Sequence, residues 1–253
     1  MGVVQALARV DDTRMEQHGI NHLSNPVFAE AGATFAEALI CRDRVVACDL
    51  VASLARRYGA FAVVDFVVAP AMRQIGDLWE CGDVDVATEH AATFVAREAL
   101  ATIQRTCERR SWLPTARRVV AFAPAQELHE LPVVMVAAAL ESMGWQTLTL
   151  GCDLPAHSTA SMTRMFGADV ACMSLSTAAA ADGALASVQA LMAIPGKRPE
   201  IWIGGGALAE DEALAERLRA AGASVVGASI GDLARIAQPE PMLHTAARAG
   251  YAS

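Results

Sequence analysis

Residues 117–140 read RRVVAFAPAQELHELPVVMVAAAL, and this stretch decides the fold. An apolar run of strand length, near 118–123, leads into a short polar turn, and a helical pattern follows over about 132–143. A strand that passes directly into a helix is the unit from which parallel sheets are built. The stretch therefore predicts the first strand and the first helix of an α/β domain, with Glu127 and His129 in the turn between them.

The same alternation continues along the chain. Further strands are expected near 146–150, 169–174, 200–203 and 224–226, and further helices near 157–166, 180–193, 209–221 and 229–237. Five such units predict a flavodoxin-like (Rossmann-type) doubly wound parallel sheet with the strand order 2-1-3-4-5. In this fold a ligand binds beyond the carboxyl ends of the strands, at the switch point between the first and third strands, where the strand order reverses. We call this edge of the sheet the rim.

Upstream of the sheet the hydrophobic period is helical. Helices are expected at about 27–41, 43–58, 61–80 and 84–110, and four helices in one block predict a four-helix bundle over 26–112. Pro114 disfavours helix in the residue before it, so 111–115 is interpreted as the linker to the sheet. The predicted organisation is an N-terminal arm (1–25), the bundle, an α/β domain over 116–240 and a tail (241–253).

Composition excludes several classes of function. The chain of 253 residues is 54% hydrophobic and 19% charged, which is typical of a compact soluble protein. Its net charge of −8 gives no basic field for a phosphate backbone, so no direct nucleic-acid binding is expected. The sequence shows no signal peptide and no membrane-spanning run, which predicts a cytoplasmic protein. Six cysteines without a Cys-x-x-Cys pair indicate neither a zinc knuckle nor a disulfide framework.

Three short signatures follow three of the predicted strands. They are Glu127-x-His129-x-x-Pro132, Ser174-x-Ser176 and Gly204-Gly205. The first alone could be a solvated surface loop, and the glycines alone could be a tight turn from strand to helix. Carboxyl ends of parallel strands share one rim, so together the three signatures predict one ligand site. Neutral imidazole is a good ligand for a transition metal, and a carboxylate two residues earlier could hold the other ring N–H.

This order and spacing resembles the cobalamin-binding family that takes its cofactor base-off with a histidine as lower cobalt ligand. The resemblance implies that His129 is the lower ligand and that Ser174, Ser176, Gly204 and Gly205 make room for the nucleotide tail of the cofactor. The family pattern usually has glycine at the position of Pro132 and leucine at that of Ser176. We expect the ligand to be retained, with Pro132 in the first turn of the following helix.

A second constellation lies in the predicted bundle, where Trp79 is followed by nine residues and then by Glu89-His90. Gly82 breaks the helix between them, so these side chains are expected at one end of two antiparallel helices. Adjacent helical residues point about 100° apart, so Glu89 and His90 cannot both face one site. Taken alone, a bundle tryptophan is more often core, and a Glu-His pair is commonly solvated.

The spacing resembles the cap of the cobalamin-dependent photoreceptor repressors of the CarH type. That resemblance implies that Trp79 is a lid over the upper face of the corrin and that Glu89 contacts an adenosyl group on cobalt. It also implies that His90 is the candidate upper ligand after light cleaves the Co–C bond. Both metal-ligating roles, that of His129 below and of His90 above, therefore come from the resemblance.

The sequence thus predicts a cobalamin-binding light sensor or regulatory protein. Its cofactor is expected to be adenosylcobalamin, or hydroxocobalamin or methylcobalamin, with biliverdin as an additional chromophore left open. About 25 residues precede the bundle, too few for a helix-turn-helix domain. Output is therefore expected through a protein partner such as a transcription regulator, or through a homo-oligomer, as in stand-alone antirepressors of the AerR type and photocobilins.

Two other functions remain open from the sequence. One is a corrinoid methyl carrier of a methyltransferase system, which also joins a four-helix cap to this α/β domain. The other is a flavodoxin-like interaction module without metal. No acid–base pair or nucleophile constellation is evident, so the sequence does not predict an enzyme.

Overall fold

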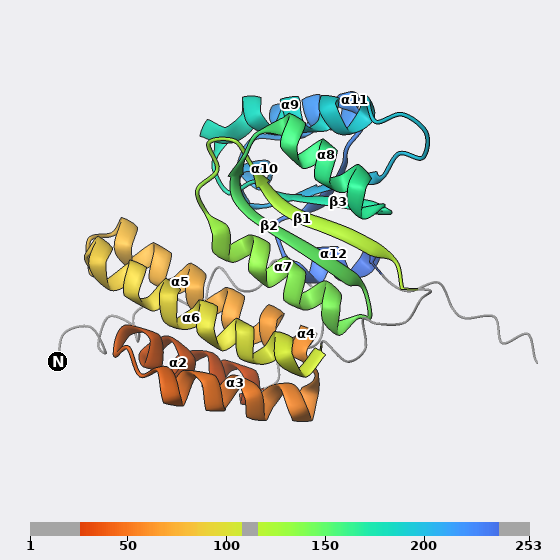
Figure 1. Ribbon diagram of the computed structural model, residues 1–253. Coiled ribbons are helices and arrows are strands. Elements are labelled where there is room, and N and C mark those ends of the chain that lie inside the picture. Colours follow the sequence, from red (N-terminus) through yellow and green to blue (C-terminus); the bar gives the residue numbers. More distant parts are fainter. Residues whose placement is uncertain (1–25, 108–115, 238–253) are drawn as a thin grey trace, which may run out of the picture.

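The computed structural model describes residues 26–107 and 116–237 (Figure 1). A helical half precedes a parallel sheet, and helices cover both faces of that sheet. The predicted arm (1–25), linker (111–115) and tail (241–253) lie outside the described residues. In the described ranges no helix is long and apolar enough to cross a membrane.

The sheet has five parallel strands in the order β2-β1-β3-β4-β5, which confirms the predicted fold. The strands are β1 (Arg118–Pro124), β2 (Gln146–Leu154), β3 (Val170–Ser174), β4 (Glu200–Gly204) and β5 (Ser224–Gly227). β2 is longer than expected because a register shift after Ala121 lets it stay paired with β1 as far as Leu154. The extension carries β2 to the rim.

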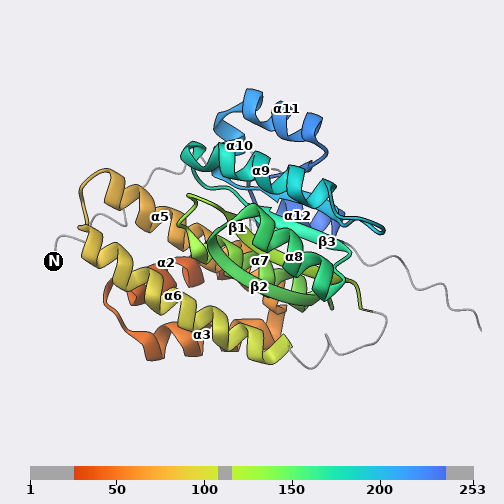
Figure 2. The ribbon, with the colours of Figure 1, turned by 45° about the horizontal axis from the view of Figure 1, so that its top comes forward.

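Two layers of helices enclose the sheet. On one face lie α7 (Glu130–Ser142) and α12 (Ile230–Ile236), and on the other lie α8 (Ala156–Phe166), α9 (Ala181–Met192) and α11 (Glu212–Ala221) (Figures 1 and 2). The short helices η3 (Ala178–Ala180) and α10 (Gly206–Glu210) precede α9 and α11. The single helix predicted at 209–221 is wrong, because Asp211 ends α10 and its side chain accepts from Leu214 N to cap α11.

The helical half contains α2 (Pro26–Ile40), α3 (Arg44–Tyr58), α4 (Ala60–Val63), η2 (Val64–Val68), α5 (Ala69–Glu80) and α6 (Val86–Cys107). The helix predicted over 61–80 runs without a break from Ala60 to Glu80 through α4, η2 and α5, and η2 is a π-helical stretch within it. Pro70 has no N–H to donate to residue 66, and its ring would crowd that carbonyl in a regular α-helix. A wider turn just before the proline relieves both problems.

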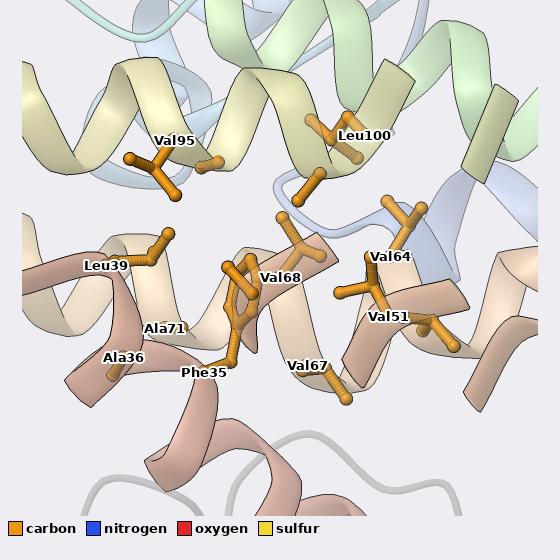
Figure 3. Close-up of a cluster of buried hydrophobic side chains, with 14 of the residues drawn as sticks. Phe35, Ala36, Leu39, Val51, Val64, Val67, Val68, Ala71, Val95 and Leu100 are labelled. Atoms are coloured by element: carbon orange, nitrogen blue, oxygen red, sulfur yellow. The ribbon is translucent and has the colours of Figure 1, made fainter. Parts of the chain in front are cut away.

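Figure 3 shows the centre of the bundle, where side chains from all of its long helices meet. Phe35 and Leu39 of α2 lie among Val51 of α3, Val64 and Val68 of η2 and Leu100 of α6. All six are fully buried. Alanines such as Ala36 and Ala71 between them allow the helices to approach closely.

Helix α7 is shared by the two halves of the molecule. Leu131, Ala138 and Ala139 belong to the apolar cluster of the bundle, which also reaches Ile230 of α12. The opposite side of α7 packs on the sheet through Val133 and Ala137, and through Leu140. A helix buried on both sides is apolar all round, which explains the run VVMVAAAL over 133–140.

Polar contacts fix how α6 lies along α7. Arg97 Nη1 is 2.6 Å from Glu130 Oε2, and Gln104 Nε2 donates to Glu141 Oε2 at 3.2 Å. Residue numbers rise in the same direction along both helices, so the two run parallel. Because Arg97 meets the first residue of α7, residues 86–96 extend past the start of α7, beyond the rim (Figures 1 and 2). We call this segment the α6 overhang.

The bundle core should dominate the stability of the helical half. Replacing fully buried Phe35 with alanine is expected to lower the free energy of unfolding by about 3–5 kcal/mol, through lost burial and a residual cavity. Urea unfolding of the cofactor-free protein, followed by circular dichroism, measures this. Val45→Ala is the control, since Val45 is 65% exposed and should change stability by less than about 0.5 kcal/mol. Equal losses in the two variants would contradict the described core.

Candidate functional site

His129 lies at the N-terminus of α7. It is the N-cap residue, with φ −77° and ψ 93°, and Glu130 begins the helix. Pro132 therefore sits in the first turn of α7, as predicted, where its missing N–H would have no partner within the helix. Proline in place of the family's glycine is thus compatible with a histidine at this turn.

The imidazole of His129 is held from one side. Its Nδ1 lies 2.5 Å from Oε1 of Glu127, and the same oxygen accepts from the His129 backbone N–H at 3.1 Å. An ionised carboxylate only accepts hydrogen bonds, so Nδ1 is the donor and neutral imidazole keeps its lone pair on Nε2. The His129 side chain is 57% exposed. A fixed Nδ1–H on an imidazole that is more than half exposed is a feature of histidines that bind a metal through Nε2.

Glu127 also joins two loops of the sheet. Its second oxygen, Oε2, accepts from Ser176 N at 2.7 Å and from Thr177 N at 2.9 Å. Glu127 follows β1, and Ser176 and Thr177 follow β3, so the carboxylate joins the loops of two neighbouring strands whose connections lead to opposite faces of the sheet. The side chain is completely buried.

These contacts shift the two pKa values in opposite directions. Burial raises the pKa of Glu127, but hydrogen bonds from His129, Thr177 and Ser176 outweigh it and bring the pKa to about 2. The hydrogen bond to Glu127 raises the pKa of His129, burial opposes this, and the charges of Glu127 and Glu89 add to the increase. Glu127 is therefore a carboxylate at neutral pH, as the Nδ1–H tautomer of His129 requires.

A third loop joins this network through residues that the sequence analysis missed. Asp153, at the end of β2, accepts from Gln126 N at 2.8 Å, and its own N–H donates to the Glu127 carbonyl at 2.9 Å. Gln126 and Asp153 have φ of 71° and 55°, unusual values for residues other than glycine. Such backbone is maintained only where the surroundings enforce it. No sequence pattern marks Gln126, and Thr177 acts mainly through its backbone.

The ends of β3 and β4 lie beside these loops. Ser174 is buried at the end of β3, and a Cβ added to Gly205, which has φ of 133°, would lie 2.1 Å from the Leu175 carbonyl oxygen. A Cβ on Gly204 would lie 2.6 Å from the Gly227 carbonyl oxygen. Close packing of neighbouring loops thus explains both glycines. The predicted contribution of Ser174, Ser176, Gly204 and Gly205 to a cofactor pocket stays a prediction.

The second constellation lies at the end of the bundle nearest the rim. Trp79 is in the last turn of α5 and is 46% exposed, while Glu89 and His90 are in the first turns of α6. The Glu89 side chain is 23% exposed and that of His90 is 75% exposed, so the two adjacent residues differ in direction. Glu89 Oε1 accepts from Thr93 Oγ1 at 2.7 Å.

The two constellations face a common region. Glu89 lies on the α6 overhang, and its charge reaches His129 closely enough to raise the pKa of that imidazole. Large apolar side chains are exposed here, among them Trp79 on the bundle and Leu128 in the turn before His129. Exposed apolar side chains beside convergent polar groups are typical of a binding site for a large, partly apolar ligand. The residues present therefore suit a metal-containing macrocycle that needs one protein nitrogen.

Comparison with known families matches both halves of the chain. Models described as B12 binding domains match residues 32–104 and residues 117–237. The first range lies in the bundle, and the second contains the sheet with the rim loops.

Individual relatives agree with this assignment. The HTH-type transcriptional repressor CarH of Myxococcus xanthus is 28% identical over 158 residues, which is 61% of this chain and 50% of the relative. The chain thus spans about half the length of that protein. Among solved structures, the monomethylamine corrinoid protein of Methanosarcina barkeri superposes with a TM-score of 0.66 at 16% identity, covering 83% of this chain and 97% of that one. This likeness shows the shared fold.

Glu127 should stabilise the fold against acid. Its folded pKa, about 2, lies below its ordinary value of 4.5, so its contribution is present above pH 4.5 and is lost as the pH falls toward 2. A shift of this size corresponds to at most about 3 kcal/mol. Cofactor-free Glu127→Gln protein should be less stable at neutral pH and should lose less stability than wild type between about pH 5 and pH 3. Urea unfolding at each pH measures the difference.

The matched control is Glu212→Gln, which alters an exposed acid on α11 and should keep the wild-type dependence on pH. If wild type and Glu127→Gln lost stability in parallel over this range, the ionised, hydrogen-bonded carboxylate would be refuted.

Proposed function

The chain belongs to the family of B12-binding domain proteins, and from this premise we propose that it is a regulatory light sensor that uses adenosylcobalamin. The observation that carries the proposal is the His129 imidazole, with Nδ1 fixed by buried Glu127 and Nε2 left for cobalt. The similarity to a transcriptional repressor supports a regulatory role.

Each half of the chain has a part in the proposed site. His129 would ligate cobalt from below, with Ser174, Ser176, Gly204 and Gly205 beside the nucleotide tail. Trp79, Glu89 and His90 would cover the opposite face from the bundle. When bound, adenosylcobalamin supplies a cobalt–carbon bond that visible light breaks.

The protein's own contacts give a route for the signal. The α6 overhang carries Glu89 and His90, and Arg97 of the same helix is bound to Glu130, the residue after His129. An upper ligand held by Glu89 would therefore add a contact between bundle and sheet. Loss of that ligand would shift the equilibrium between an arrangement with this contact and one without it. Output would pass to a protein partner such as a transcription regulator, or to a second copy, because a net charge of −8 does not favour binding to DNA.

An absorption spectrum tests the proposal directly. Protein loaded with adenosylcobalamin in the dark should show a base-off, histidine-ligated spectrum that changes on green illumination. His129→Ala should abolish the ligated spectrum, since Nε2 is the proposed donor, whereas Glu127→Gln should weaken ligation by freeing the ring. An unchanged spectrum under light, together with rapid demethylation of bound methylcobalamin by a cognate methyltransferase, would favour the methyl carrier. A second absorption band in the red after incubation with biliverdin would show that the protein also binds a bilin chromophore.

His90 should matter only after illumination. Its side chain is 75% exposed, so His90→Ala should leave folding and dark binding intact, while the spectrum of the illuminated protein should differ from wild type. The matched control is His157→Ala, which removes a histidine from the start of α8 on the far face of the sheet. Identical illuminated spectra in wild type and His90→Ala would rule out His90 as the upper ligand.

A further inference from the structure

Thr93 donates its hydroxyl to a side chain rather than to the backbone of its own helix. A helical Ser or Thr commonly donates to the backbone carbonyl four residues earlier. The residues that follow this rule are Thr34, Thr102, Thr159 and Ser187. Thr93 Oγ1 instead donates to a side chain, the Oε1 carboxylate oxygen of Glu89, at 2.7 Å.

The position of this pair over the rim is fixed by its neighbour on α6. Arg97 is ion-paired with Glu130, and Thr93 and Glu89 follow on the same side of the helix, one and two turns toward its N-terminus. They lie about 6 Å and about 12 Å farther along the axis, at 1.5 Å per residue. The α6 overhang thus presents the pair beyond the start of α7, in the region that His129 also faces.

The hydrogen bond leaves half of the carboxylate available. Glu89 Oε2 is 3.6 Å from His90 Nε2, which is too long for a hydrogen bond. The other oxygen is held by Thr93, so the carboxylate plane is set while Oε2 can accept. Glu89 remains partly exposed, and a bound molecule can reach it.

We propose that Thr93 is a positioning residue that holds Glu89 as an acceptor for the ribose hydroxyls of a nucleoside upper ligand, and so makes the site prefer adenosylcobalamin to methylcobalamin. This inference rests on the proposed function. Ribose hydroxyls can donate to Oε2, whereas a methyl group has no donor. The preference therefore depends on where the carboxylate points.

Threonine suits this role for two physical reasons. Its β-branched side chain has few χ1 rotamers in a helix, so its hydroxyl is itself well placed. A glutamate side chain has high rotamer entropy, and fixing it before the ligand arrives lowers the cost of binding. Without the Thr93 hydroxyl, Glu89 would exchange between the site, solvent and His90.

Dark binding of two cofactors to the full chain tests the inference. Dissociation constants for adenosylcobalamin and methylcobalamin can be measured from quenching of tryptophan fluorescence. Thr93→Val keeps the shape of the side chain and removes the hydroxyl. It should weaken adenosylcobalamin binding about fivefold, as expected for one side chain that must be immobilised on binding, and change methylcobalamin binding by less than about twofold. Thr93→Ser should retain the wild-type preference.

Two further variants separate positioning from general structure. Thr102→Val removes the hydroxyl that bonds the Glu98 carbonyl on the same helix, and it should leave both affinities unchanged. In a Glu89→Ala background, Thr93→Val should have no further effect, because the residue that it positions is gone. Equal thermal midpoints for Thr93→Val and Thr102→Val would show that both fold normally.

The outcomes distinguish the two levels of the proposal. Three results would each overturn the role of Thr93. The first is that Thr93→Val weakens the binding of both cofactors equally, and the second is that it keeps the wild-type preference for adenosylcobalamin. The third is that it weakens adenosylcobalamin binding just as much in the Glu89→Ala background. Wild-type protein that binds adenosylcobalamin no better than methylcobalamin would overturn the adenosyl function itself.

Discussion

The carboxylate of Glu127 has no contact with solvent, so its charge must be balanced from within the protein. It accepts from backbone N–H groups of three residues and from the His129 ring, and those donors come from the loops after β1 and β3. An unpaired buried charge would cost several kcal/mol. The loops therefore have to converge, and the orientation of His129 is fixed by the same requirement. The buried charge of Glu127 therefore determines both how the rim loops pack and which nitrogen of the His129 ring carries the proton.

The position of the bundle depends on α7, the helix whose N-cap residue, His129, belongs to this hydrogen-bond network. One side of α7 lies in the bundle cluster and the other lies on the sheet, so the helix cannot shift without disturbing two cores. Small side chains such as Ala138 and Ala139 let the bundle approach, and Asp65 Oδ1 of η2 accepts from Gly231 N of α12 at 3.1 Å. The bundle is thus held against the same face of the sheet at two places.

Hydrophobic period and topology were enough to predict the strand order, the bundle and the approach of Glu127 and His129 to the third strand, because parallel strands end at one rim. Partners that are backbone N–H groups, as at Ser176 and Thr177, carry no side-chain signature. The π-helical turn before Pro70 relieves the clash between the proline ring and the carbonyl of residue 66, and the sequence does not show how the helix will relieve it. The Arg97–Glu130 pair joins distant residues whose charges resemble those of any solvated face. Tertiary contacts of this kind are not visible in local sequence.

The strengths of the contacts between bundle and sheet suggest where movement would begin under the proposed function. The Arg97–Glu130 pair is partly exposed to solvent, and solvent-exposed pairs contribute only about 0–1 kcal/mol. The apolar contacts of Leu131, Ala138 and Ile230 are buried and cost far more to break. Loss of a ligand contact at Glu89 could therefore free the α6 overhang while the rest of the bundle stays on α7. A local rearrangement at the rim requires less free energy than separation of the two halves, and it would change the surface beside Trp79 that a partner could recognise.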